Sequence, residues 1–486
     1  MNICKLLPLA LALATTPTFA EETRDTWRGY SRVRFEVDGC QAWIVEPKQP
    51  LPGKPWTWCM EFPDAFTDRT GVPELLEKGF HHVHIVVGNT HGSPGALKHF
   101  DAFYAALQQR GLARKGALIG LSRGGLYAYN WAAKNPEKVA CIYGDAPVCD
   151  FKSWPGGKGK GKGSKGDWSA LIKNYGFQDE AEALAYKGNP VDSLEPIAKA
   201  GIPLLHVVGD ADDVVPVAEN TAIIEERYKA LGGSITVIHK PGVGHHPHGA
   251  DDTVPVVAFL LKHAGDAARD LGVILPLGDS ITHGVGGGSG YRAPLLRKLT
   301  EAGFTLRYNG SIDAGSTPEL KAAGQERHDG HSGFIIDGRD LFGSKPPRKG
   351  LYENMVAWKQ PARVDRILLK IGSNDVNQRF LLDGAPARLE GLVEHLLDEK
   401  AGVHPGARLY IGSILPMHTF ANADDLVKAY NAAIPGIVER QRAKGRAVFF
   451  VDLYGSVQPS DLPDRLHPNA GGYEKMAGAW FNAMTE

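Results

Sequence analysis

The sequence has no long apolar run beyond its first 20 residues and almost no net charge. No later stretch offers the roughly 20 consecutive apolar residues with which a helix crosses a bilayer. The formal net charge is -1, from 54 Lys and Arg against 55 Asp and Glu. Nucleic-acid and anionic-surface binding usually require a basic excess, so neither a nucleic acid nor a membrane is expected as a partner. These counts say nothing about the oligomeric state.

Cysteine is scarce as well. Cys4 lies in the N-terminal apolar segment, and four cysteines follow it, namely Cys40, Cys59, Cys141 and Cys149. The sequence contains no Cys-x-x-Cys or His-Glu-x-x-His spacing, so we expect neither a metal nor any other cofactor. In an oxidising compartment we expect two disulfides, Cys40–Cys59 and Cys141–Cys149, because each pair is close in sequence.

The first 20 residues have the pattern of a secretory signal peptide. Lys5 is the only charge, residues 6–14 are apolar, and Thr18-Phe19-Ala20 fits a cleavage site. We therefore expect a secreted or periplasmic protein. The remaining length exceeds one ordinary core, so we expect two domains, residues 21–264 and 272–486, joined by a small, polar linker over residues 265–271.

The C-terminal half contains four blocks that together indicate acyl-transfer chemistry. Gly278-Asp279-Ser280 follows the apolar run Val273–Leu277, and the later blocks are His331-Ser332-Gly333, Gly372-Ser373-Asn374-Asp375 and Asp464-Arg465-Leu466-His467. A serine on the turn after a buried strand can be presented as a nucleophile. Acyl transfer also needs a base near neutral pKa, a carboxylate that orients it and donors for the tetrahedral oxygen.

These four blocks, in this order, resemble the SGNH (GDSL) hydrolase family, and most closely its acetylxylan-esterase-like members. The resemblance implies a flavodoxin-like three-layer α/β/α fold. It also implies roles: Ser280 as nucleophile, His467 as general base and Asp464 as the carboxylate that orients it. The oxyanion hole would be formed by the amides of Ser280 and Gly333 and by the side chain of Asn374.

The N-terminal half alternates strands and helices, which predicts a mostly parallel sheet covered on both faces. Gly120-Leu121-Ser122-Arg123-Gly124 stands between the strand Ala117–Ile119 and the helix Leu126–Asn135. This G-x-S-x-G motif in a strand–turn–helix context is typical of a nucleophile elbow. Here the chain resembles the α/β-hydrolase fold, over most of residues 32–263.

That second resemblance implies an acid and then a histidine. Gly209-Asp210-Ala211-Asp212-Asp213-Val214-Val215-Pro216 resembles the acid turn and selects Asp212, and Gly244-His245-His246-Pro247-His248 resembles the histidine loop and selects His245. The three histidines of that loop could instead form a metal cluster, but no carboxylate or cysteine has a fitting spacing. The oxyanion donors would be the amides of Arg123 and Phe62, although the His-Gly-Gly motif of the family is absent.

Between Asp150 and Asn189 lies an insertion in the position of the lid of α/β hydrolases. Its Gly- and Lys-rich stretch, residues 156–165, is flexible by composition. The lysines are expected to be solvated, or else to attract an acidic polymer. Trp154 and Trp168 could stack on sugar rings, whereas core packing is favoured for Trp56 and Trp58.

The sequence therefore predicts an exported carbohydrate esterase with two serine sites. The C-terminal site would deacetylate a plant or algal polysaccharide, and the N-terminal site would cleave an acetyl, feruloyl or uronic methyl ester. One alternative is a single-site acetylesterase whose N-terminal half is a silent binding module. A lipase or thioesterase is a further alternative, but no long apolar lid segment supports it.

Overall fold

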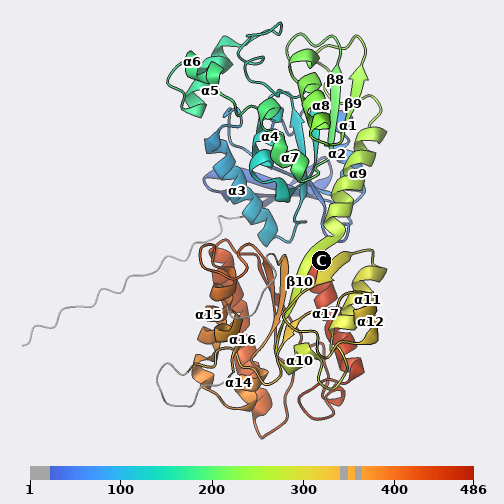
Figure 1. Cartoon of the computed structure of the whole chain (residues 1–486), viewed down its shortest axis with the longest axis vertical. Helices are drawn as coiled ribbons and strands as arrows, with labels where there is room; N and C mark the ends of the chain where they lie inside the picture. Colours follow the sequence, from blue (N-terminus) through green and yellow to red (C-terminus); the bar gives the residue numbers. More distant parts are fainter. Residues whose placement is uncertain (1–21, 340–348, 356–363, 486) are drawn as a thin grey trace, which may run out of the picture.

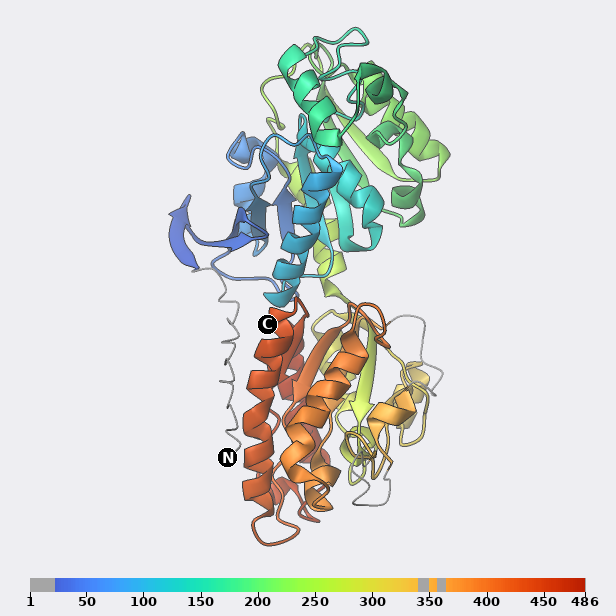
Figure 2. The same ribbon diagram turned by 90° about the vertical axis from the view of Figure 1, so that its left-hand side faces the viewer.

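The computed structural model describes residues 22–339, 349–355 and 364–485. It contains two α/β domains that are stacked along the long axis of the molecule (Figures 1 and 2). The expected fold class is therefore confirmed. The expected signal peptide lies outside the described residues. Within the described residues, no helix is both long and apolar enough to cross a bilayer.

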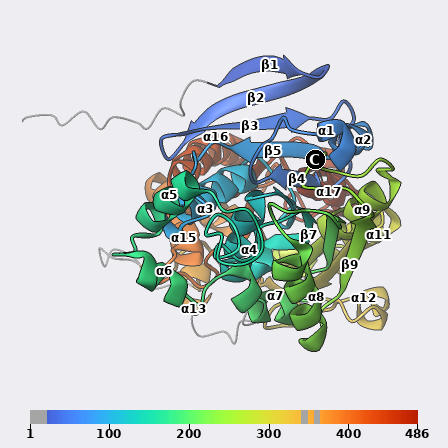
Figure 3. The same cartoon turned by 90° about the horizontal axis from the view of Figure 1, so that it is seen from above.

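The N-terminal domain is built on a nine-stranded sheet in the order β1-β2-β3-β5-β4-β6-β7-β8-β9. Pairing is antiparallel from β1 to β5 and parallel from β5 to β9, and β1 and β2 lie at one edge (Figure 3). The strands are β1 Thr23–Trp27, β2 Tyr30–Val37, β3 Cys40–Glu46, β4 Trp56–Cys59, β5 His81–Ile85, β6 Gly116–Leu121, β7 Val139–Asp145, β8 Leu204–Gly209 and β9 Ile235–Lys240.

Helices cover both faces of this sheet, as parallel strands require. One face packs on α3 Pro94–Gln109, α4 Gly124–Lys134, α7 Glu195–Lys199 and α8 Thr221–Ala230. The other face packs on α2 Val72–Glu77 and α9 Val254–Arg269. Trp56 and Trp58 are fully buried in the core on the α3 face. The core packing predicted for both tryptophans is confirmed.

The C-terminal domain has a parallel sheet in the order β11-β10-β13-β14-β15, with β12 also paired to β10. When β12 is left out and the other five strands are numbered in chain order, their order in the sheet is 2-1-3-4-5, the flavodoxin-like arrangement. The strands are β10 Asp270–Gly278, β11 Thr305–Tyr308, β12 Asp329–Gly330, β13 Arg366–Lys370, β14 Arg408–Gly412 and β15 Val448–Val451. The flanking helices include α15 Ala385–Leu397 and α16 Ala423–Ala443 on one face, and α11 Arg292–Glu301 and α17 Ala470–Thr485 on the other.

The junction between the domains differs from the expected linker. Helix α9 continues to Arg269, and β10 begins at Asp270, so residues 265–271 contain no irregular segment (Figure 1). The small residues of this stretch serve packing, because Ala264 and Ala268 are buried on the inner face of α9. A helix that runs directly into a strand leaves little freedom at the junction.

The two predicted disulfides are wrong, since all four cysteines are free thiols. Neighbours in sequence here occupy opposite faces of the sheet. Cys59 and Cys141 belong to the core that includes α9, whereas Cys149 and Cys40 pack against the core that includes α3. Strand side chains alternate between faces, and the sheet therefore separates the cysteines of each expected pair.

The insertion between Asp150 and Asn189 is folded. It forms α5 Lys165–Tyr175 and α6 Glu180–Ala185, with Ser164 as the N-cap of α5. Its glycine- and lysine-rich loop has defined contacts: Lys162 pairs with Asp213 at 2.5 Å, and Lys158 pairs with Glu180. Trp168 is buried against Phe151 and is unavailable as a sugar platform.

Candidate functional site

Ser122 lies on a sharp turn between β6 and α4. Its backbone has a left-handed φ of +48°, which is unfavourable for any residue other than glycine. Gly120 permits this turn, because a Cβ there would lie 2.8 Å from the Gly124 carbonyl oxygen. The Ser122 amide donates to Asp145, and the Ser122 carbonyl accepts from Val148 at 2.8 Å. These bonds fix the serine at the carboxyl end of the sheet.

The predicted N-terminal triad comes together. Ser122 Oγ lies 2.9 Å from His245 Nε2, and His245 Nδ1 lies 2.7 Å from Asp212 Oδ2. Asp212 Oδ1 accepts from the amides of Val214 and Val215, which fixes the orientation of the carboxylate. The Asp212 side chain is only 1% exposed. The acid and base are therefore held by a buried scaffold.

The predicted oxyanion donors of this site lie beside each other. Phe62 follows β4, and the Arg123 guanidinium stacks over its ring at 4.8 Å. Arg123 is the N-cap residue of α4, at the helix end where backbone N–H groups have no partner within the helix. Their role as donors stays a prediction.

A polar network around Arg123 was not anticipated from the sequence. The guanidinium donates to Glu61 at 2.8 Å and lies 3.6 Å from Asp167, which comes from helix α5 of the insertion. Asp167 in turn contacts His91 Nε2 at 3.4 Å. Burial raises the pKa of Glu61 and lowers that of His91. The insertion thus supplies a charged group to the surroundings of Ser122.

The C-terminal nucleophile lies at the end of β10, where Gly278 lets the chain turn. A Cβ at Gly278 would overlap the Lys370 carbonyl oxygen, so this position requires close backbone approach. Ser280 opens the short helix α10, Ser280–His283, and Asp279 caps that helix by accepting from Ile281 N at 3.0 Å. Ser280 is 8% exposed.

The predicted C-terminal triad comes together as well. Ser280 Oγ lies 2.9 Å from His467 Nε2, and His467 Nδ1 lies 2.7 Å from Asp464 Oδ2. Burial would raise the pKa of Asp464, but hydrogen bonds from His467 and Leu466 lower it overall. The Asp464 side chain is 55% exposed. The two triads therefore share their distances and differ in the burial of the acid.

The remaining predicted donors of this site follow β12 and β13, the two strands that pair with β10 on the side of Ser280. Gly333 belongs to the turn after β12, where His331 N donates to the Gly278 carbonyl at 2.9 Å. Asn374 is in helix α14, Ser373–Asn377, and one of its Nδ2 hydrogens is donated to Phe334 O at 2.9 Å. Within the described residues Asn374 Nδ2 makes no other hydrogen bond, so its second hydrogen is available to a substrate oxygen.

A buried ion pair behind Ser280 was also missed. Lys370 Nζ lies 3.1 Å from Asp279 Oδ2, and both side chains are fully buried. Lys370 also donates to Ser373 Oγ in a short bond. The available signal was a lysine in the apolar run Ile367–Ile371, because lysine is rarely buried unless it is paired.

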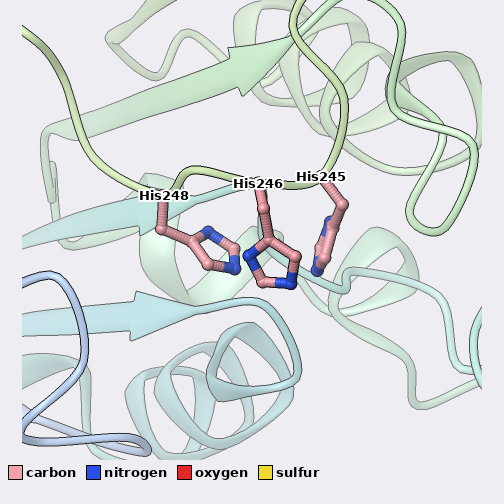
Figure 4. Close-up of side chains that lie close together, drawn as sticks. All are labelled: His245, His246 and His248. Carbon is pink, nitrogen blue, oxygen red and sulfur yellow. The ribbon is translucent and has the colours of Figure 1, made fainter.

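Three histidines, including the predicted base His245, lie close together in the N-terminal site. His245, His246 and His248 come from the one loop after β9, and Figure 4 shows His246 between the other two. His248 Nδ1 lies 2.6 Å from Asp145 Oδ1, a carboxylate that also accepts from Gly249 N and Tyr143 Oη. His246 is exposed, and partial burial and the neighbouring histidines lower its pKa.

Comparison with known proteins shows which proteins this chain resembles. Residues 277–475 match the GDSL-like Lipase/Acylhydrolase family. The chain is 30% identical over 224 residues to a multidomain esterase of Ruminococcus flavefaciens, an alignment that covers 43% of this chain and 28% of the relative. The chain thus spans little more than a quarter of that protein.

Solved structures of esterases resemble parts of the chain. A Clostridium thermocellum family 3 carbohydrate esterase is 30% identical, with a TM-score of 0.36, and the match covers 43% of this chain and 94% of that one. Est1E from Butyrivibrio proteoclasticus is 16% identical, with a TM-score of 0.35, and the match covers 50% of this chain and 99% of that one. The residues that match the GDSL-like family, 277–475, lie in the C-terminal domain.

Proposed function

We propose that this chain is an exported carbohydrate esterase with two independent serine hydrolase sites, one in each domain. The observation that carries the proposal is that the same Ser–His–Asp triad, called a relay below, occurs twice. In both domains a serine Oγ lies 2.9 Å from a histidine Nε2, whose Nδ1 lies 2.7 Å from an aspartate. Each relay is complete within its own domain.

The chemistry follows from this geometry. The histidine removes the proton of the serine as Oγ attacks the ester carbonyl, and the aspartate stabilises the imidazolium that forms. Collapse of the tetrahedral intermediate breaks the ester C–O bond, transfers that proton to the departing alcohol oxygen and leaves an acyl-serine. Water, activated by the same histidine, then releases the acid. Backbone and amide donors hold the negative oxygen throughout.

For the C-terminal site we propose deacetylation of a plant or algal polysaccharide. The GDSL-family match and the relationship to a multidomain esterase support an ester substrate. The donors would be the Ser280 and Gly333 amides and the free N–H of Asn374. A small acyl group suits a nucleophile that is only 8% exposed.

For the N-terminal site we propose cleavage of a second ester of the same polymer. The charged groups near Ser122, contributed by Arg123, Glu61 and Asp167, favour a polar substrate over a lipid. The acyl group would be acetyl, feruloyl or a uronic methyl ester. The intact Ser122, Asp212 and His245 relay argues against a purely binding role for this domain.

The decisive experiment uses Ser122→Ala, Ser280→Ala and the double variant. Release of acid or alcohol is measured from acetylated xylan, mannan and pectin and from methyl ferulate, with products resolved by NMR. Each single variant should lose one activity and keep the other, and the double variant should be inert. If Ser280→Ala removes every activity while Ser122→Ala removes none, the N-terminal domain is a binding module. If one single variant that remains folded loses both activities, the sites are not independent.

A further inference from the structure

The histidine loop of the N-terminal domain has the geometry of a three-histidine metal site. Nitrogen atoms of His245, His246 and His248 all lie within 4.8 Å of one another, and their ring centroids are 5.0, 4.8 and 4.9 Å apart. Three imidazoles on one tetrahedral ion, with bonds of about 2.1 Å, place their ring centres about 5 Å apart. Small rotations would therefore bring the three nitrogens onto one ion.

In two of the three histidines, the ring nitrogen that would not bind the metal already contacts a carboxylate, as is usual for metal-binding histidines. His248 Nδ1 lies 2.6 Å from Asp145, and His245 Nδ1 lies 2.7 Å from Asp212. These carboxylate side chains are 0% and 1% exposed. A carboxylate that accepts the Nδ1 hydrogen leaves Nε2 unprotonated and able to bind a metal. This arrangement fixes both ring orientations before an ion arrives.

The surroundings leave the nitrogens accessible. Among the described residues, no group forms a hydrogen bond with His248 Nε2, although that side chain is only 5% exposed. His246 is exposed and stacks on Phe66, so an ion can reach it from solvent. The loop itself is held by Lys240, which donates to the carbonyls of Pro247 and Gly249.

We propose that His245, His246 and His248 bind a borderline divalent transition-metal ion, and that this ion switches off the N-terminal esterase site. Imidazole nitrogens suit ions such as Zn²⁺. The ion and the Ser122 hydroxyl compete for His245 Nε2, which lies 2.9 Å from Ser122 Oγ. A metal-bound His245 cannot accept the serine proton. The switch rests on the proposed function, but the binding site does not.

The C-terminal domain provides an internal control. Its relay has the same 2.9 and 2.7 Å distances, yet within the described ranges no cluster of potential metal ligands includes His467. Zn²⁺ should therefore inhibit the activity that depends on Ser122 and spare the activity that depends on Ser280.

The test is titration of the full, tag-free chain with ZnCl₂ by calorimetry after treatment with a chelator. The chain should bind one Zn²⁺ at this site, and His246→Ala should weaken that binding at least tenfold. His239→Ala, which removes an exposed histidine of β9 outside the loop, should bind Zn²⁺ as the parent does. His248→Gln serves as a second variant if it retains the parent's circular dichroism spectrum.

Ester release is then measured with and without Zn²⁺. Inhibition of the Ser122-dependent activity should be reversed by chelator and weakened at least tenfold by His246→Ala. Absence of Zn²⁺ binding, or equal affinity in His246→Ala, would overturn the metal site. If Zn²⁺ binds as expected but Ser122 releases no ester from any substrate, the proposed function of this domain fails and the metal site stands.

Discussion

The buried ammonium of Lys370 connects the two turns that form the C-terminal site. It lies 3.1 and 3.3 Å from the carboxylate oxygens of Asp279 and also contacts Ser373 Oγ. Asp279 immediately precedes Ser280, and Ser373 immediately precedes Asn374. Burial lowers the pKa of Lys370, whereas Asp279 opposes that shift. We infer that this cation positions the nucleophile and the oxyanion donor relative to each other.

Lys370→Met tests this inference, because methionine fills much of the same volume without the charge. It would leave Asp279 buried and uncompensated, and losing one partner of a buried ion pair typically costs about 3–5 kcal/mol. Lys370→Met combined with Asp279→Asn removes both charges, so we expect the double variant to lose less than the two single losses added together. Hydrogen exchange of the β13 amides reports the opening free energy of this domain alone.

The single variant Lys370→Met should also lower kcat for deacetylation. A displacement of about 1 Å at a catalytic group can cost about 100-fold in rate, so we expect a loss of 10- to 100-fold with little change in KM. Ester cleavage at the Ser122 site of the same variant protein is the matched control, and its rate should be unchanged. If Lys370→Met loses less than about 1 kcal/mol of stability and keeps kcat, the positioning argument is wrong.

Three further predictions follow from burial. Asp212→Asn should reduce kcat/KM by up to about 10⁴-fold, and Asp464→Asn should cost at least tenfold less because the Asp464 side chain is 55% exposed and Asp212 1%; equal losses would contradict this. The purified protein should titrate as four thiols and keep its mass on reduction, and a mass gain of two or four hydrogens would contradict the free cysteines. Burial lowers the pKa of His82 and His206 to about 3, below the ordinary 6.5. Stability from these neutral histidines is therefore complete above pH 6.5 and is lost as pH falls toward 3, by up to about 1.4 kcal/mol per pH unit for each histidine; equal urea-unfolding free energies at pH 7 and pH 5 would refute it.

The nucleophile turns could be predicted because their signals are local. Gly120 and Gly278 stand beside Ser122 and Ser280, at points where the structure brings another backbone too close for a side chain. The histidines and acids were selected by the resemblance of their loops to family motifs, and parallel strands deliver such loops to one edge of a sheet. A short motif therefore carried enough information to bring residues more than 100 positions apart into one relay.

The errors arose where sequence distance was taken as spatial distance. Cys141 and Cys149 are close along the chain, but they belong to cores on opposite faces of the sheet. The segment 265–271 looked like a linker by composition, although its alanines pack on the inside of a helix. The Lys370–Asp279 pair joins residues 91 positions apart, and only the pairing of β10 with β13 makes them neighbours.

The contacts between the domains lie away from the two proposed sites. Contacts between the domains involve the amino ends of the strands: Arg408, the first residue of β14, donates to Gln108 and Leu112, and Gly53, before β4, donates to Thr485. Ser122 and Ser280 follow the carboxyl ends of β6 and β10, the ends away from these contacts. For the two proposed sites, we infer that fusion acts through a polymer long enough to reach both, because a chain bound at one site raises its own concentration at the other.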